Sequence, residues 1–265
     1  MVASINCPCF SMSANEFWDR PLVFYAIKRT GSSPRFLSMS FSSVPDSHSS
    51  RETVYQGQFG SFTITPNDRL GVWVYRGALN GAALAFALGA TLVFLKGETF
   101  WSLQMATLCY GIFWIGLGIA LATIHIYMIA LHRLLQAFWA IGGLASIGFA
   151  VTQSDPLVLY VYQHPFAIVG VGFSFAALTG IFFKEAFCFD RFETKILTPI
   201  VPGLLLGHLV GLLPQSIETA LLMVWAIFFL VFGFRKLQQE VPGDIGDKSV
   251  FDYLKQSNPE NTANP

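Results

Sequence analysis

The chain has 265 residues, of which 53% are hydrophobic and only 12% are charged, and its formal net charge is +0. Soluble globular proteins carry about 25% charged residues, so this composition excludes a soluble enzyme and a wholly disordered chain. A nucleic-acid-binding protein needs a basic excess, which the balanced charge excludes as well. The class that remains is a polytopic membrane protein.

Residues 1–50 differ from the rest of the chain. They contain twelve serines, four Lys or Arg and three acidic residues, and no apolar run long enough for a signal-peptide core. This profile is typical of an organellar transit peptide. A disordered tail or an over-extended translation start explains the same composition, and both interpretations stay open. Residues 51–70 predict a short surface element, because Tyr55–Thr65 alternates polar with aromatic or β-branched residues.

A helix start follows at once, with Thr65 as N-cap, Pro66 in the first helical position and Asp68 placed to bond back to the cap. Six apolar stretches then lie close to the ~20 residues that cross ~30 Å of hydrocarbon. In lipid such stretches must be helical, because every backbone polar group has to be satisfied internally. The predicted spans are 72–95, 103–128, 134–152, 164–183, 196–213 and 217–234.

The predicted fold is therefore an all-α bundle of six transmembrane helices over residues 71–235, followed by a disordered cytoplasmic or stromal tail, 236–265. The entry into the fourth span has two readings. Leu157–Tyr162 is either a short surface segment before the span or part of a helix kinked at Pro165.

Basic residues orient this bundle. Cytoplasmic loops of membrane proteins carry an excess of Lys and Arg, and here one side holds eight of them near the membrane while the opposite loops hold only Lys96. The bias predicts that both termini lie inside. The eight residues are Arg69, Arg76, Arg133, Lys184, Arg191, Lys195, Arg235 and Lys236.

Small residues recur every fourth position in three spans, a pattern that lets membrane helices approach closely. The stripes are Gly77/Gly81/Ala85/Gly89, Gly172/Ala176/Gly180 and Gly203/Gly207/Gly211. They predict contact faces within one bundle, with homodimerisation through one Gly-rich face as the alternative.

Ionisable residues inside spans are candidates for function, and here they are Arg76, His125, His164 and His208. His125 and His132 are predicted two turns apart on the second span, too far apart to share a metal ion. His164 and His208 are predicted at similar depth, where haem ligation, a proton relay or an interhelical hydrogen bond are the alternatives. For Arg76 the alternative is a side chain that reaches the inner headgroups.

No enzyme motif with HExxH, GxSxG, P-loop or EF-hand spacing occurs, and no span holds a carboxylate pair. The cysteines and histidines do not fall at metal-ligand spacing. The sequence predicts neither an enzyme nor a metal or other cofactor.

The densest polar stretch, from 184 to 195, is predicted to be an inner loop. It is either a short interfacial helix with internally paired charges or a docking surface for a partner. Its charged residues are Lys184, Glu185, Asp190, Arg191, Glu193 and Lys195.

Two blocks, KEAFCFDRFETKILTPIVPGLLLGHLVGLLP and VYQGQFGSFTITPNDRLGVWVYRGALNGAALAFALG, resemble a family of uncharacterised integral membrane proteins of cyanobacteria and photosynthetic plastids. The resemblance runs from Val54 to Arg235. It implies a plasma or thylakoid membrane in a cyanobacterium, or a plastid membrane, and it brings no activity and no catalytic residues.

Two functions follow as expectations. The first is a non-enzymatic accessory or assembly factor that sits in the lipid bilayer, binds no nucleic acid and serves a larger membrane protein complex. The second is a small-solute or ion transporter with a site near the fifth span, which Pro199 and Pro202 bend and which carries His208.

Overall fold

The computed structural model describes residues 54–56, 61–124, 129–241 and 245. The predicted leader (1–50) and, of the predicted tail (236–265), residues 242–244 and 246–265 lie outside these residues. The elements are β1 (Val54–Gln56), β2 (Ser61–Thr63), α1 (Pro66–Lys96), α2 (Phe100–Thr123), α3 (Ile129–Thr152), α4 (Leu157–Gln163), the 3₁₀ turn η2 (Pro165–Ala167), α5 (Ile168–Phe189), α6 (Phe192–Leu209) and α7 (Gln215–Gln238).

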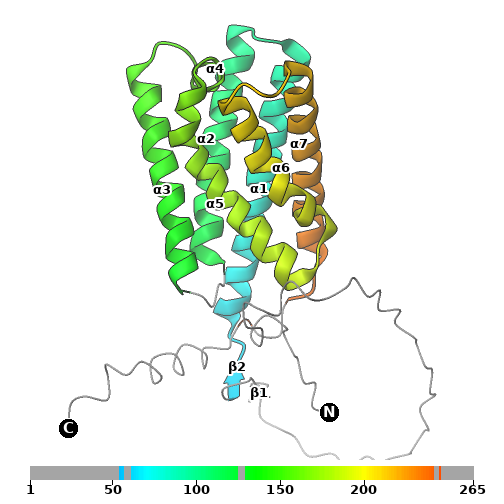
Figure 1. Cartoon of the computed structure of the whole chain (residues 1–265). Helices are drawn as coiled ribbons and strands as arrows, with labels where there is room; N and C mark the ends of the chain where they lie inside the picture. Colours follow the sequence, from blue (N-terminus) through cyan, green and yellow to red (C-terminus); the bar gives the residue numbers. More distant parts are fainter. Residues whose placement is uncertain (1–53, 57–60, 125–128, 242–244, 246–265) are drawn as a thin grey trace, which may run out of the picture.

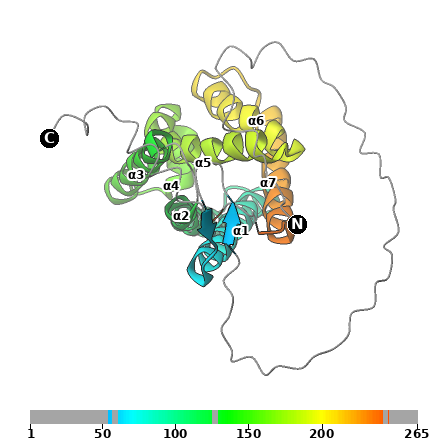
Figure 2. The ribbon, with the colours of Figure 1, turned by 90° about the horizontal axis from the view of Figure 1, so that it is seen from below.

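The long helices form a closed ring in chain order (Figures 1 and 2). Each of α1, α2, α3, α5, α6 and α7 packs against the next, and α7 packs against α1. Helix α1 begins and α7 ends at the same end of the bundle, the lower end in Figure 1. We call this the inner end and the opposite end the outer end. The short helix α4 lies at the outer end, where it contacts α2 and α3.

The predicted start of α1 is confirmed. The Thr65 side chain accepts a hydrogen bond from the Asp68 backbone N–H at 3.3 Å, and the Asp68 carboxylate accepts one from the Thr65 N–H at 3.0 Å. This reciprocal capping box satisfies two donors that a helix start leaves unpaired. Just before it, β1 and β2 pair antiparallel with Tyr55 opposite Phe62, in the stretch for which the sequence predicts a surface element.

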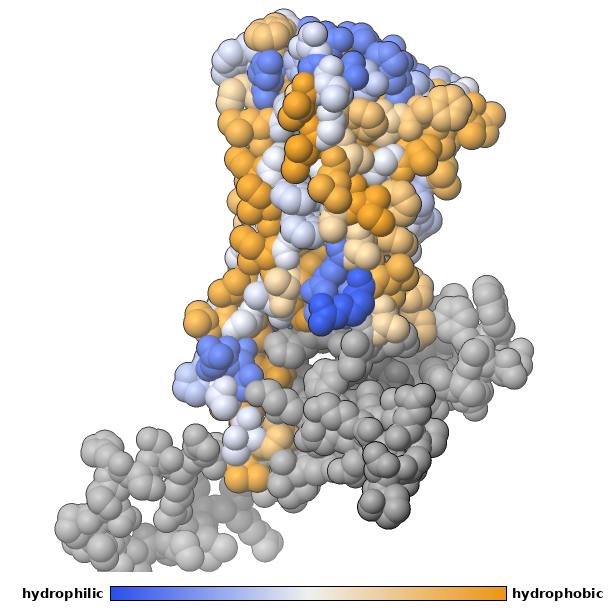
Figure 3. Space-filling view, turned by 90° about the vertical axis from the view of Figure 1, so that its left-hand side faces the viewer, coloured by the Kyte–Doolittle hydropathy of each residue, from blue (hydrophilic) through white to orange (hydrophobic). Residues whose placement is uncertain are grey.

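Five helices within the described part of the chain are long and apolar enough to cross a membrane: Pro66–Lys96, Phe100–Thr123, Ala130–Thr152, Pro165–Phe189 and Gln215–Gln238. Figure 3 shows the corresponding band of apolar side chains between hydrophilic residues at the top and near the lower end. Helix α6, the counterpart of the fifth predicted span, is not among these five. The helical membrane bundle is thus supported, whereas a count of six spans depends on α6.

Several predicted boundaries are wrong. Helix α5 continues to Phe189 and α7 to Gln238, beyond the predicted ends at 183 and 234. Both helices continue because their terminal charged residues pair with each other inside the bundle, so the charges do not mark helix ends. Asp190, in the left-handed region with φ 49°, then ends α5. Leu157–Gln163 is a separate helix, since Pro165 starts a new turn; this favours the surface-segment reading.

Trp114 of α2 and Trp139 of α3 pack against each other and join the two helices. Their rings stack with centroids 4.4 Å apart at 9°. Trp114 Nε1 donates to the Trp139 carbonyl at 3.2 Å, and Trp139 Nε1 donates to the Trp114 carbonyl at 2.9 Å. Each ring lies over a glycine of the opposite helix: a Cβ at Gly143 would overlap the Trp114 ring, and one at Gly118 would overlap the Trp139 ring. These glycines leave the room that the stack needs.

The three predicted small-residue stripes pack only in part. A Cβ at Gly89 would lie 3.1 Å from Cys109 Cβ of α2, and one at Gly180 would overlap Leu135 of α3. Gly77, Gly81 and Gly203 have nothing within 4 Å of an added Cβ, so these positions are open. A close approach of two helices lies outside these stripes, where a Cβ at Gly142 of α3 would overlap the backbone of Ser174 in α5.

Candidate functional site

A cavity of about 470 Å³ occupies the outer half of the bundle. A cavity of this size is typical of small-molecule sites, which range from about 300 to 1,000 Å³. Its walls come from α1, α2, α4, α5, α6 and α7, and most of the lining is aliphatic or aromatic. Lining residues that reach the outer end include Gly97, Glu98, Tyr162 and Gln215, and Tyr162 is 41% exposed. The mouth of the cavity is therefore at the outer end.

Aromatic rings close the cavity toward the middle of the bundle. Phe86 and Phe175 line it. Behind them, the Trp225 ring lies 4.4 Å from Phe86 and 5.2 Å from Phe175, centroid to centroid, and the Phe113 ring stacks on Phe175 at 5.5 Å. Phe113 and Trp225 are almost fully buried. This layer, which we call the aromatic floor, separates the cavity from the inner half.

The polar groups of the cavity gather near its mouth around His208. Its Nδ1 lies 2.7 Å from Glu218 Oε1 and its Nε2 lies 3.1 Å from the Tyr162 carbonyl oxygen. The Tyr162 ring stacks on the imidazole with centroids 5.1 Å apart. Burial raises the pKa of the Tyr162 phenol, and the negative charges of Glu218 and Glu98 raise it further. Three helices, α4, α6 and α7, thus meet at one imidazole.

The predicted pairing of His164 with His208 is not seen. Both ring nitrogens of His208 are engaged, which leaves neither for a haem iron. His164 Nδ1 lies 3.1 Å from the Tyr160 carbonyl oxygen of its own segment, and its ring stacks on the Tyr160 ring. Of the three alternatives predicted for His208, the structure shows interhelical hydrogen bonds, to Glu218 and to the Tyr162 carbonyl.

The prediction that His125 and His132 share one helix is wrong. Helix α2 ends at Thr123, His132 lies on α3, and His125 lies outside the described residues. His132 Nε2 donates to the Leu121 carbonyl at 2.6 Å, at the end of α2. This bond satisfies one of the carbonyls that a helix end leaves unpaired. Among the described residues, no three His, Cys, Asp or Glu side chains come together as metal ligands.

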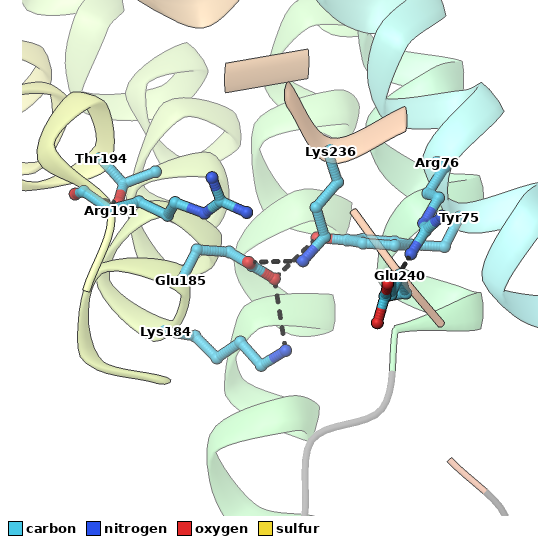
Figure 4. Close-up of polar contacts among 8 residues, drawn as sticks. All are labelled: Tyr75, Arg76, Lys184, Glu185, Arg191, Thr194, Lys236 and Glu240. Atoms are coloured by element: carbon cyan, nitrogen blue, oxygen red, sulfur yellow. Dashed lines mark hydrogen bonds and ion pairs between the residues drawn. The ribbon is translucent and has the colours of Figure 1, made fainter. Parts of the chain in front are cut away.

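The inner end holds a second polar cluster, centred on Glu185 (Figure 4). Its Oε2 accepts from Lys236 Nζ at 2.6 Å, and its Oε1 accepts from Lys184 Nζ and the Tyr75 hydroxyl, both at 3.3 Å. The side chains of Glu185 and Lys236 are 1% and 7% exposed. Lys236 Nζ also lies 4.2 Å from the centre of the Phe189 ring. The cluster joins α1, α5 and α7 at the inner end.

Arg76 is buried next to this cluster, with 2% of its surface exposed. Its guanidinium donates to the Glu240 carbonyl at 3.1 Å and lies 5.4 Å from the centre of the Trp73 ring. The prediction of a side chain that reaches out to the headgroups does not fit this burial. One turn further on, Asn80 Nδ2 donates to the Arg76 and Gly233 carbonyls, both at 2.9 Å, and so joins α1 to α7.

The predicted docking loop is largely helix, and three of its six charged residues pair within the bundle. Lys184 and Glu185 belong to α5, and Glu193 of α6 accepts from Arg235 at 2.8 Å. Only Asp190 and Arg191 lie between the two helices. Asp190 pairs with Lys195 at 2.5 Å, and the Asp190 side chain is 86% exposed.

Sequence reasoning missed the partners that complete both sites. Glu218, Tyr162, Tyr75 and Lys236 were not predicted as site residues. Each meets its partner on another helix, and the separation in sequence runs from 10 positions for His208 and Glu218 to 110 for Tyr75 and Glu185. Glu185 was predicted in the polar loop 184–195, just beyond the predicted span that ends at 183. Nothing in the sequence therefore marked it as a buried carboxylate that requires a cationic partner.

The chain matches the model of a known protein family. Residues 119–253 match a protein family described as "Uncharacterized integral membrane protein (DUF2301)". The matched stretch contains α3 to α7 and with them His208, Glu218 and Glu185. Neither a curated protein nor a solved structure matches the chain.

Proposed function

We propose that this chain, which belongs to the DUF2301 family of uncharacterised integral membrane proteins, is a non-enzymatic membrane carrier. It takes a small amphiphilic molecule into its outer cavity. The single observation that carries the proposal is the cavity itself. It is a space of about 470 Å³ with apolar walls and with a few polar groups at its mouth.

The closure of the inner half supports the same proposal. Below the cavity lie the aromatic floor and then the Glu185 cluster, in which α1, α5 and α7 are tied together. A cavity that is open at one end and closed at the other is the arrangement expected of a carrier in one of its two access states. Helix α6, with Pro199 and Pro202 inside it, forms one wall through Leu204, Leu205 and His208. A proline removes a backbone hydrogen bond and so eases bending.

Photolabelling tests the proposal. The purified protein in phosphatidylcholine nanodiscs is irradiated with decanol that carries a diazirine on its tail, and the labelled peptides are mapped by mass spectrometry. We expect labels on Ala85–Phe94 of α1 and Ile168–Phe175 of α5, which line the cavity. Excess unlabelled decanol should remove them.

Two matched variants locate the labels. Gly172 lines the cavity, and a Cβ there meets only Ile168 Cγ2 of its own helix, at 3.3 Å. Gly172→Leu therefore fills cavity space and should abolish the labelling. Gly148 of α3 is exposed and has nothing within 4 Å, so Gly148→Leu should leave it unchanged. Equal labelling of both variants, or labels spread over lipid-facing residues such as Leu144, would refute the cavity as the binding site.

A second candidate is an accessory or assembly factor of a larger membrane complex. It is favoured by one face of α1, where Gly77 and Gly81 are exposed with nothing within 4 Å and Trp73 is 54% exposed. Small residues on an open helix face permit close approach of another helix, from a partner or from a second copy. Gly77→Leu/Gly81→Leu should then release the protein from a larger species on native gels, and Gly148→Leu should not. Co-migration unchanged by the double variant speaks against this role.

The proposal also includes the number of spans, the side on which the termini lie and the kind of membrane. We propose that α6 is the sixth span, with both termini on the cytoplasmic or stromal side of a plasma, thylakoid or plastid membrane. The start of α1 and the end of α7 lie at the same end, where Arg76 bonds to Glu240. That end also carries the basic excess predicted to lie inside. Reporter fusions at either terminus test the orientation.

A further inference from the structure

The charges that line the outer cavity are unevenly distributed. Glu98, in the connection between α1 and α2, and Glu218, in the first turn of α7, both line the cavity near its mouth. Among the described residues, no Lys or Arg lines it; Lys96 lies outside the lining. Carboxylates are ionised at neutral pH, so the mouth favours a cationic group over an anionic one.

The His208–Glu218 contact offsets the charge of Glu218 but leaves that of Glu98. A carbonyl oxygen only accepts hydrogen bonds, so His208 Nε2 donates to Tyr162, and the Nδ1–Oε1 contact of 2.7 Å then needs one further proton. Wherever that proton lies, the His208–Glu218 pair is neutral as a whole. Glu98 then leaves the mouth negative. Within the described part of the chain, His208 is the only side chain that bonds to the Glu218 carboxylate, and it does so through Oε1.

An aromatic face lies beside these carboxylates. The Tyr162 ring lines the cavity and is partly exposed at the mouth. Both Glu218 and Glu98 are near enough to act electrostatically on its hydroxyl. An ammonium group binds well where a carboxylate and the face of an aromatic ring are close together. Behind the mouth the walls are apolar for about 13 Å along α1, from Phe94 to Ala85 at 1.5 Å per residue.

We propose that the ligand of this cavity is a single-chain amphiphile with an ammonium head. The head lies at the mouth between Glu98, Glu218 and Tyr162, and the alkyl tail extends along α1 and α5 to the aromatic floor. This inference rests on the proposed function, because it names the substrate class of the same cavity. A fatty-acid anion would place its carboxylate near that of Glu98 and would bind less well.

Competition among three ligands with one tail tests the head group. Decylamine, decanol and decanoate each compete with the diazirine-labelled decanol in phosphatidylcholine nanodiscs, and the labelling of Gly172→Leu is subtracted as background. We expect decylamine to compete at a concentration lower than decanol by about fivefold, the effect of one favourable charge contact in a partly hydrated site. Decanoate should be the weakest of the three.

Two size-conserving variants show whether the carboxylates set the preference. Glu98→Gln removes the net negative charge of the mouth and should reduce the advantage of decylamine over decanol. Glu218→Gln replaces one member of a neutral pair and should reduce that advantage less. Both variants should leave the labelling by the decanol probe itself in place. Cavity labelling with equal competition by all three heads, or with decanoate strongest, would overturn this inference while the proposed carrier function stands. Failure of the decanol probe to label the cavity would instead overturn the proposed function.

Discussion

Replacing Glu185 by glutamine removes the charge at the centre of the inner cluster. The carboxylate lies 2.6 Å from Lys236 and 3.3 Å from Lys184, and its side chain is 1% exposed. Lys184 is 19% exposed and can turn toward the headgroups, but Lys236 is 7% exposed and stays inside with no counter-charge. Loss of one partner of a buried ion pair costs about 3–5 kcal/mol. Glu185→Gln should therefore lower the free energy of unfolding by that amount.

Unfolding of the purified protein by increasing SDS in mixed micelles, followed by circular dichroism, measures this change. Asp190→Asn is the matched control, because its pair with Lys195 is exposed and should contribute less than about 1 kcal/mol. The double variant Glu185→Gln/Lys236→Met removes both charges and should recover most of the stability. If Glu185→Gln costs no more than Asp190→Asn, or if the double variant is as unstable as the single one, the account of the cluster is wrong.

Three further substitutions test how the helices pack, and each is measured by the same SDS unfolding. Gly142→Ala brings a Cβ into the Ser174 backbone and should lower the free energy of unfolding by about 1–3 kcal/mol. Gly148→Ala places its Cβ in open space and should leave the free energy of unfolding unchanged. Equal effects would contradict the close approach of α3 and α5. Asn80→Leu removes the bond from α1 to the Gly233 carbonyl and should cost about 0.6–1.7 kcal/mol, and an unchanged stability would show that this bond contributes little. Trp139→Phe loses the donor to the Trp114 carbonyl and should destabilise the α2–α3 pair by a similar amount; a variant as stable as the parent chain would refute that role.

The start of α1 was predictable because its signals are local. Thr65, Pro66 and Asp68 lie within four positions, and the capping box depends only on that spacing. The apolar stretches were predictable for the same reason, since hydrophobicity along the chain is enough to mark a span. The closed ring was not predicted, because the packing of α7 against α1 is a contact between the two ends of the bundle's sequence.

The sites were not predictable because they depend on contacts between distant helices. Lys184 and Glu185 were expected in a loop, since charged residues normally mark the end of a span. They remain helical because Lys236, 51 positions from Glu185, neutralises the carboxylate inside the bundle. His208 and Glu218 are only 10 positions apart, but they lie on two helices whose relative depth the sequence does not give.

An experimental density map of the protein in nanodiscs with decylamine tests the central claim most directly. The account predicts one alkyl chain between α1 and α5, with its amine near Glu218 and Tyr162 and its tail ending at Phe86 and Phe175. Alkyl density found only in the lipid belt around the bundle, with side chains filling the outer cavity, would contradict it.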